Sequence, residues 1–119
     1  MLFLGRNTQA PARALIDAGA AVALATDFNP GTSPTVNFPL ILTLGVSQLR
    51  MSASEAIVAA TVNGAAALGL AGVTGQIAAG YSADLAIFEA EDFREIPYWY
   101  GDRRCMATWA RGKACQAPD

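Results

Sequence analysis

Apolar and small residues occupy every position from Ala20 to Ala25, and this run ends at Thr26 and the carboxylate of Asp27. The run is too short for a helix between two turn signals, so it predicts a buried strand from about Ala21 to Thr26. A strand that is apolar on both faces is typical of a parallel sheet or barrel. Such folds bind ligands beyond the carboxyl ends of their strands, which is where Asp27 stands.

The residues before this run predict a helix that extends through Ala18. Thr8 or Asn7 can cap its start, Pro11 fits only its first turn, and Gly19 is well placed to end it. A helix, a glycine and then a buried strand make one αβ step of the kind that a (β/α) barrel repeats.

Two further helices are expected after the strand. Residues 36–49 are apolar around the whole circumference of a helix, which predicts a buried helix with Asn37 as a cap. Ser52 and Glu55 have the spacing of a capping box, and they predict a second helix over residues 53–68.

Glycines at 72, 75 and 80 then interrupt the helical pattern. Residues 84–88 and 105–110 read as strands, and Arg111 and Gly112 mark a turn after the second one. The segment between them is irregular and aromatic. Its side chains and Trp109 predict packing in a core or at a domain interface rather than nucleic-acid stacking, because basic residues are few: Phe93, Tyr98, Trp99, Tyr100.

The composition indicates that part of the surface is meant to be covered. Charged residues make up 15% of the 119 positions, against roughly 25% in an average soluble domain. A small free-standing domain has relatively more surface, so other chain segments or a partner must cover the excess apolar area. The net charge of -2 gives no electrostatic case for nucleic acid or an anionic membrane. No apolar run reaches the ~20 residues of a membrane span, and a cytoplasmic protein is expected.

The chain contains no histidine. A catalytic zinc site typically has about three protein ligands, and one aspartate cannot hold such a metal alone. Cys105 and Cys115 fit no zinc spacing, and no histidine is present to activate either thiol.

The loop after Asp27 leaves two interpretations open. Asn29 offers amide donors and an acceptor, Gly31 exposes its backbone, and Thr32 adds a hydroxyl, so the three could bind a ligand. An ordinary Asn-Pro-Gly turn uses the same residues. The hydroxyls of Thr26 and Ser33 could support the carboxylate, although loop hydroxyls more often bond their own backbone.

The decapeptide from Ala25 to Pro34 resembles the signature of the imidazolonepropionases, in the metal-dependent amidohydrolase superfamily. The resemblance extends over nearly the whole chain, from about residue 3 to about residue 113. Further matching stretches are residues 10–19, 37–40, 55–56, 65–70, 80–88 and 96–101.

The resemblance implies an α/β fold, namely the C-terminal portion of a (β/α)8 amidohydrolase barrel with strands of a small β-sandwich. Residues 1–71 would form the last barrel strand and its flanking helices, and residues 72–119 the sandwich strands. The missing histidines fit the C-terminal fragment of a longer enzyme, which is expected to be inactive alone.

The resemblance also implies site roles. Asp27 would bind one divalent metal ion, zinc or iron, and accept a proton from the attacking water, while Asn29, Gly31 and Thr32 would contact the substrate. The intact enzyme would hydrolyse 4-imidazolone-5-propanoate to N-formimidoyl-L-glutamate in histidine degradation, as a homodimer with no nucleic-acid or membrane partner. Two alternatives remain open: another amidohydrolase-superfamily hydrolase or aminohydrolase, or a non-catalytic binding or scaffold module.

Overall fold

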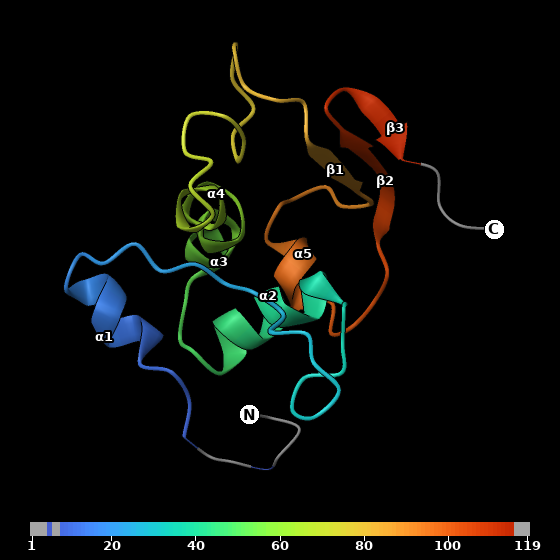
Figure 1. The fold of residues 1–119 in the computed structure, drawn as a ribbon. Helices are drawn as coiled ribbons and strands as arrows, with labels where there is room; N and C mark the ends of the chain where they lie inside the picture. Colours follow the sequence, from blue (N-terminus) through green and yellow to red (C-terminus); the bar gives the residue numbers. More distant parts are fainter. Residues whose placement is uncertain (1–4, 6–7, 116–119) are drawn as a thin grey trace.

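The computed structural model describes residue 5 and residues 8–115, and it combines short helices with one small sheet (Figure 1). The elements, in chain order, are α1 (Ala12–Asp17), α2 (Phe38–Ser47), α3 (Ala53–Ala60), α4 (Val62–Ala67), β1 (Leu85–Phe88), α5 (Glu95–Tyr98), β2 (Cys105–Ala110) and β3 (Lys113–Cys115).

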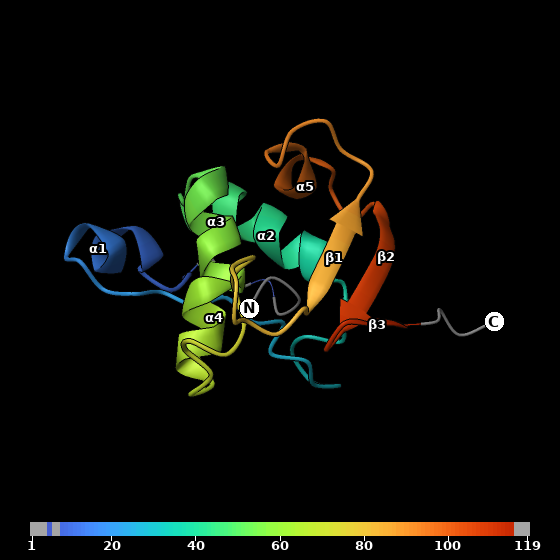
Figure 2. The ribbon, with the colours of Figure 1, turned by 90° about the horizontal axis from the view of Figure 1, so that it is seen from above.

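The helices and the sheet lie side by side rather than in a closed barrel. Seen from above, α1 lies at one side, α3 and α4 in the middle, and the sheet at the other side beyond α2 (Figure 2). Ala12, Met51 and Ala59 form the buried centre of the helical part. Four half-buried side chains pack against that centre: Ile16, Val22, Leu24 and Leu49.

The predicted start of α2 is confirmed. Asn37 precedes the helix, and the Leu40 N–H donates to its side-chain oxygen at 3.1 Å. The capping box of α3 is also confirmed, since the Glu55 N–H donates to Ser52 Oγ while the Ser52 N–H donates to Glu55 Oε2 at 2.7 Å.

Helix α1 is shorter than expected. Pro11 occupies its N-cap position, and no side chain caps the helix, so the cap predicted at Thr8 is wrong; Asn7 lies outside the described residues. The end of α1 agrees with the prediction. Gly19 adopts φ +83° and its N–H donates to Ile16 O, while the Ala20 N–H donates to Leu15 O. This pair of bonds is a Schellman motif.

The single helix predicted over residues 53–68 is interrupted at Thr61. Its backbone has φ -119° and ψ -86°, and its hydroxyl donates to Ile57 O at 2.7 Å. A hydroxyl that bonds back to the carbonyl four residues earlier disturbs the helix there, and sequence periodicity alone did not predict the break. Gly69 ends α4 as expected, with φ +72°.

The strand predicted over residues 21–26 does not form a ladder. The segment is an extended trace between α1 and the loop at Asp27 (Figure 1), and no strand partner for it is found among the described residues. Exposure alternates along it, with Val22 and Leu24 half-buried against the helices and Ala23 and Ala25 exposed. The expectation of burial on both faces was therefore wrong for the described chain.

The sheet has the order β1-β2-β3 and is antiparallel throughout. Its first two strands confirm the prediction, with Leu85 opposite Trp109 and a register shift between Ile87 and Phe88. Arg111 and Gly112 both adopt positive φ, as in a type I′ hairpin turn. The third strand, and the short helix α5, were not predicted.

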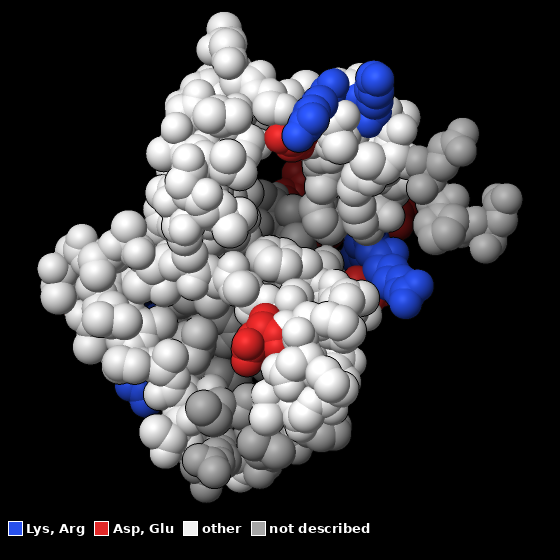
Figure 3. Space-filling model, in the orientation of Figure 1, with Lys and Arg blue, Asp and Glu red and all other residues white. Residues whose placement is uncertain are grey.

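Large apolar side chains lie on the surface in both parts of the molecule. Tyr98 and Tyr100 are 74% and 68% exposed, so these two aromatic side chains are not core residues of the described chain. Trp99 stacks against Arg104, whose guanidinium carbon lies 4.9 Å from the ring centroid. Figure 3 shows a face made mostly of uncharged residues, with charged side chains in a few spots.

Candidate functional site

Asp27 ends the extended segment and begins the candidate site. Its backbone adopts φ +50°, in the left-handed region that is uncommon for residues other than glycine. Within residues 8–115 the carboxylate receives no hydrogen bond and forms no ion pair, and the residue is exposed. A free carboxylate in an unusual backbone conformation is available to an external ligand, and such outliers are concentrated at functional sites.

Asn29 is bonded within its own loop. Its Nδ2 donates to Asp27 O at 2.7 Å and to Thr32 Oγ1 at 3.0 Å. Its Oδ1 accepts from the N–H groups of Gly31 at 3.0 Å and Thr32 at 2.7 Å. This arrangement is the Asx-type turn that sequence analysis kept as the alternative to a ligand site. The polar groups of Asn29, Gly31 and Thr32 are therefore brought together, but in this conformation they satisfy one another.

Backbone bonds close the same loop. The Asn29 N–H donates to Ser33 O at 3.1 Å, and these two residues form an isolated β-bridge. Ser33 Oγ donates to Thr26 O at 2.6 Å, so this hydroxyl bonds backbone rather than the carboxylate. The loop is thus a small closed unit that holds Asp27 at one end.

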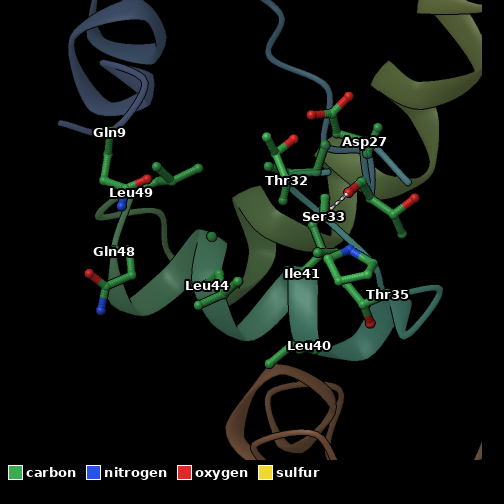
Figure 4. A pocket seen from close by; sticks show the side chains of 15 residues that line it. Gln9, Asp27, Thr32, Ser33, Thr35, Leu40, Ile41, Leu44, Gln48 and Leu49 are labelled. Carbon is green, nitrogen blue, oxygen red and sulfur yellow. Dashed lines mark hydrogen bonds between the residues drawn. The ribbon is translucent and has the colours of Figure 1, made fainter. Parts of the chain in front are cut away.

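A pocket of about 410 Å³ lies beside this loop. Figure 4 shows Asp27, Thr32 and Ser33 gathered at one end of it, with Leu40, Ile41 and Leu44 of α2 along one wall. Gln9, Gln48 and Leu49 lie at the opposite end. Gln9 and Gln48 were not predicted near the site, because nothing in the chain's pattern distinguishes these glutamines from ordinary surface residues.

Over residues 8–115, no hydrogen bond or ion pair joins the Asp27 carboxylate to a charged group with a displaced pKa. The hydrogen bonds from Arg13 and from the Ser52 N–H lower the pKa of Glu55 to about 2. The Arg111 N–H, then the hydroxyls of Thr74 and Ser82, lower the pKa of Asp84. Asp84 binds local amide and hydroxyl groups at the start of β1 rather than joining Asp27.

The donor set around Asp27 fits one ligand of a metal ion and no more. Across the described residues, no group of three or more Asp, Glu, Cys or His side chains could hold a metal. One exposed carboxylate can supply a single oxygen ligand to zinc or iron. Any further ligands would have to come from beyond these residues, and the chain contains no histidine.

No helix of the described ranges is long and apolar enough to cross a membrane.

The chain is similar over most of its length to known hydrolases. A model of the Amidohydrolase family matches residues 4–115. An imidazolonepropionase of Bacillus velezensis is 48% identical over 111 residues, which cover 93% of this chain and 26% of that protein. An imidazolonepropionase of Geobacillus thermodenitrificans is 52% identical over 99 residues, which cover 83% of this chain and 23% of that protein. An imidazolonepropionase of Rubrobacter xylanophilus is 51% identical over 111 residues, which cover 93% of this chain and 26% of that protein.

The chain thus spans about a quarter of the length of the curated relatives it matches. The family match covers the helices, the loop at Asp27 and the sheet together. On this match the chain belongs to the amidohydrolase family.

Proposed function

We propose that this chain supplies Asp27 to an enzyme of the imidazolonepropionase type, which hydrolyses the ring amide of 4-imidazolone-5-propanoate to give N-formimidoyl-L-glutamate. The observation that carries the proposal is the free carboxylate of Asp27 at the closed Asn29–Ser33 loop. Support comes from relatives named imidazolonepropionase at 48–52% identity along the same stretch.

In this proposal the Asp27 carboxylate has two tasks. One oxygen would bind a divalent metal ion, zinc or iron, and the carboxylate would accept the proton of the water that attacks the ring carbonyl. The chemistry that the bound ion supplies is a lowered pKa of water, toward about 7. The left-handed backbone of Asp27 and its bond to the Asn29 amide hold the carboxylate at the end of the segment, on the side of the pocket.

We assign the substrate contacts to Asn29, Gly31 and Thr32. Their polar groups are bonded to one another in the turn that directly follows Asp27, and Thr32 lines the pocket beside Asp27. Because these groups are bonded to each other in the free loop, substrate binding would exchange loop bonds for substrate bonds. Asn29 would then both shape the loop and recognise the substrate.

The extended segment would be the last strand of a barrel. Successive backbone groups of an extended chain point to opposite edges. On one edge the Leu24 N–H donates to Ala59 O and Val22 O accepts from Asn63, while the other edge carries Ala23 and Ala25. Over residues 8–115, no hydrogen bond to the backbone of Ala23 or Ala25 is found.

That open edge supports a barrel portion over residues 1–71, with residues 72–119 as sandwich strands. The exposed apolar side chains also fit a chain that is covered by further protein, such as Ile77 at 92% and Leu68 at 76% exposure. In the intact enzyme we propose a cytoplasmic homodimer, as the sequence resemblance implies.

A chimera tests the function. In the imidazolonepropionase of Bacillus velezensis, the stretch that matches this chain is replaced by this chain, and the purified protein is assayed with 4-imidazolone-5-propanoate in the presence of zinc or iron. We expect turnover by the chimera and none by the 119-residue chain alone.

The same assay separates the alternatives. Turnover of a different cyclic amide or of an amine in preference to 4-imidazolone-5-propanoate would favour another hydrolase of the family. A folded chimera that binds metal but turns over no substrate would favour a binding or scaffold module. Turnover by the isolated chain would contradict the proposal that the remaining ligands lie outside it.

A further inference from the structure

We propose that the ion pair between Arg13 and Glu55 positions the segment that ends at Asp27, so that both are positioning residues for the proposed hydrolase. This inference rests on the proposed function only where activity is measured. The pair joins α1, which precedes the segment, to α3, which begins 26 residues after Asp27.

The pair has the two-pronged geometry that fixes orientation as well as distance. Arg13 Nη1 donates to Glu55 Oε2 at 2.9 Å, and Nη2 donates to Oε1 at 3.0 Å. Parallel bonds of this kind are directional, and a lysine cannot form both of them. The side chains of Arg13 and Glu55 are 35% and 30% exposed, so water reaches the pair only in part.

Glu55 serves two elements with one carboxylate. Its Oε2 also accepts the Ser52 N–H at 2.7 Å in the capping box of α3, and Arg13 Nη1 reaches Arg50 O at 3.4 Å. The turn before α3 and the helix α1 are therefore tied at the same point. Since α1 has only six residues and no side-chain cap, its own hydrogen bonds cannot keep it in place.

The same two helices hold the extended segment. Ala12 of α1 and Ala59 of α3 belong to the buried cluster against which Val22 and Leu24 pack. The Leu24 N–H also donates to Ala59 O at 3.1 Å. Figure 1 shows the segment running from α1 past α3 toward the loop. If α1 separates from α3, Ala12 leaves the cluster against which Leu24 packs, three residues before Asp27.

The first test measures the segment directly and requires no activity. In the 119-residue chain, Glu55→Gln removes the charge but can still cap α3, because glutamine also serves in a capping box. We expect faster amide hydrogen exchange at Leu24 in Glu55→Gln than in the unmodified chain. Asp17→Asn is the matched control, since it removes the exposed partner of Arg13 within α1 and leaves the pair with Glu55; its Leu24 exchange should be unchanged.

The second test uses the chimera under saturating metal and substrate. We expect Glu55→Gln and Arg13→Gln each to lower kcat by about 3- to 30-fold, the size of coupling through a positioning contact, with KM little changed. The double variant should lose no more than either single variant, and Asp17→Asn should keep the unmodified kcat.

Several results would overturn the inference. These are unchanged Leu24 exchange in Glu55→Gln, an equal effect in Asp17→Asn, or losses of kcat that multiply in the double variant. If Arg13→Gln does not fold, Glu55→Gln, which keeps its cap, decides the kinetic test. An inactive unmodified chimera would count against the proposed function alone, and Leu24 exchange would still decide the positioning role.

Discussion

The helical region, residues 12–71, and the sheet region, residues 85–115, differ in how the backbone of their extended segments is hydrogen-bonded. In the sheet region every strand finds its partner within thirty residues, and the ladder β1-β2-β3 forms. In the helical region the segment at 21–26 has strand-like alternation but only helices beside it, so one of its edges stays open. A strand pattern therefore predicts a conformation, whereas a ladder requires a partner within the same molecule.

The two regions also differ in the role of their aspartates. Asp84, at the start of the sheet, accepts bonds from the Arg111 N–H and the Thr74 hydroxyl, each at 2.8 Å, and has a structural role. The carboxylate of Asp27, at the end of the open segment, receives none from the described residues. The acid whose oxygens are satisfied belongs to the fold, and the acid whose oxygens are free is the candidate for catalysis.

The largest effect is expected at Asp27. Asp27→Asn in the chimera keeps the shape of the side chain but removes its charge and its capacity to accept a proton. We expect kcat to fall by at least about 10²- to 10³-fold, with little change in the Tm. Steady-state kinetics and thermal unfolding measure both, and a variant that kept most of its rate would make Asp27 a structural residue like Asp84.

A large loss of stability is expected at Gly75, where the chain crosses α4. A Cβ there would lie 2.8 Å from Thr61 O and 2.9 Å from the Ala65 side chain, and φ is +89°. Gly80 is the matched control, because its φ is +88° but no atom lies within 4 Å. Gly80→Ala should cost about 1–2 kcal/mol of unfolding free energy from backbone strain alone, and Gly75→Ala about 1–3 kcal/mol more.

Urea unfolding of the two alanine variants gives the difference directly. Equal losses of unfolding free energy would mean that α4 shifts to accommodate the new methyl group, so that residue 75 is not tightly packed against this helix.

A smaller effect on the chemistry is expected within the loop. Asn29→Ala should lower kcat/KM by about 5- to 150-fold, because the Asn29 amide that bonds the loop and, in the proposal, the substrate is removed. The metal content should stay the same. Thr32→Val should lose less, because the Thr32 N–H and its bond to the loop remain. Metal analysis with kinetics of both chimera variants checks this. Loss of metal in Asn29→Ala, or unmodified kinetics in both variants, would contradict the substrate contacts and favour an ordinary turn.

The smallest effect is expected from the titration of Asp84. Its pKa is lowered by the Arg111 N–H first and then by the Thr74 and Ser82 hydroxyls, so its ionised form stabilises the folded chain. That contribution is complete above the ordinary pKa of about 3.9 and is lost as the pH falls through the lower pKa of the folded state. The Tm difference between the unmodified chain and Asp84→Asn should therefore shrink below about pH 4. A difference that stays constant down to pH 2 would contradict this role.

Features set by neighbouring residues were predictable from the sequence. The cap of α2 at Asn37, the Ser52–Glu55 box and the ends of helices at Gly19 and Gly69 all depend on contacts within about five residues. The family match agrees with the resemblance carried by the loop at Asp27.

Features for which the residue pattern allows two outcomes, or which depend on a distant partner, were not predictable. The break at Thr61 depends on a choice between a helical bond and a side-chain bond that periodicity does not resolve. The segment at 21–26 has an apolar pattern that says nothing about whether a partner strand is present. The bonds of Asn29 to its own loop fit the turn interpretation as well as the ligand one, and residue types alone could not separate the two.

The central claim is that the Asp27 carboxylate binds the metal ion of a larger hydrolase. A crystal structure of the zinc-loaded chimera, with anomalous scattering recorded at the zinc edge, tests it most directly. The account predicts an anomalous peak about 2.0–2.2 Å from a carboxylate oxygen of Asp27, with the other ligands supplied by the rest of the chimera. A zinc peak bound elsewhere, with the Asp27 carboxylate bonded only to protein groups, would contradict it.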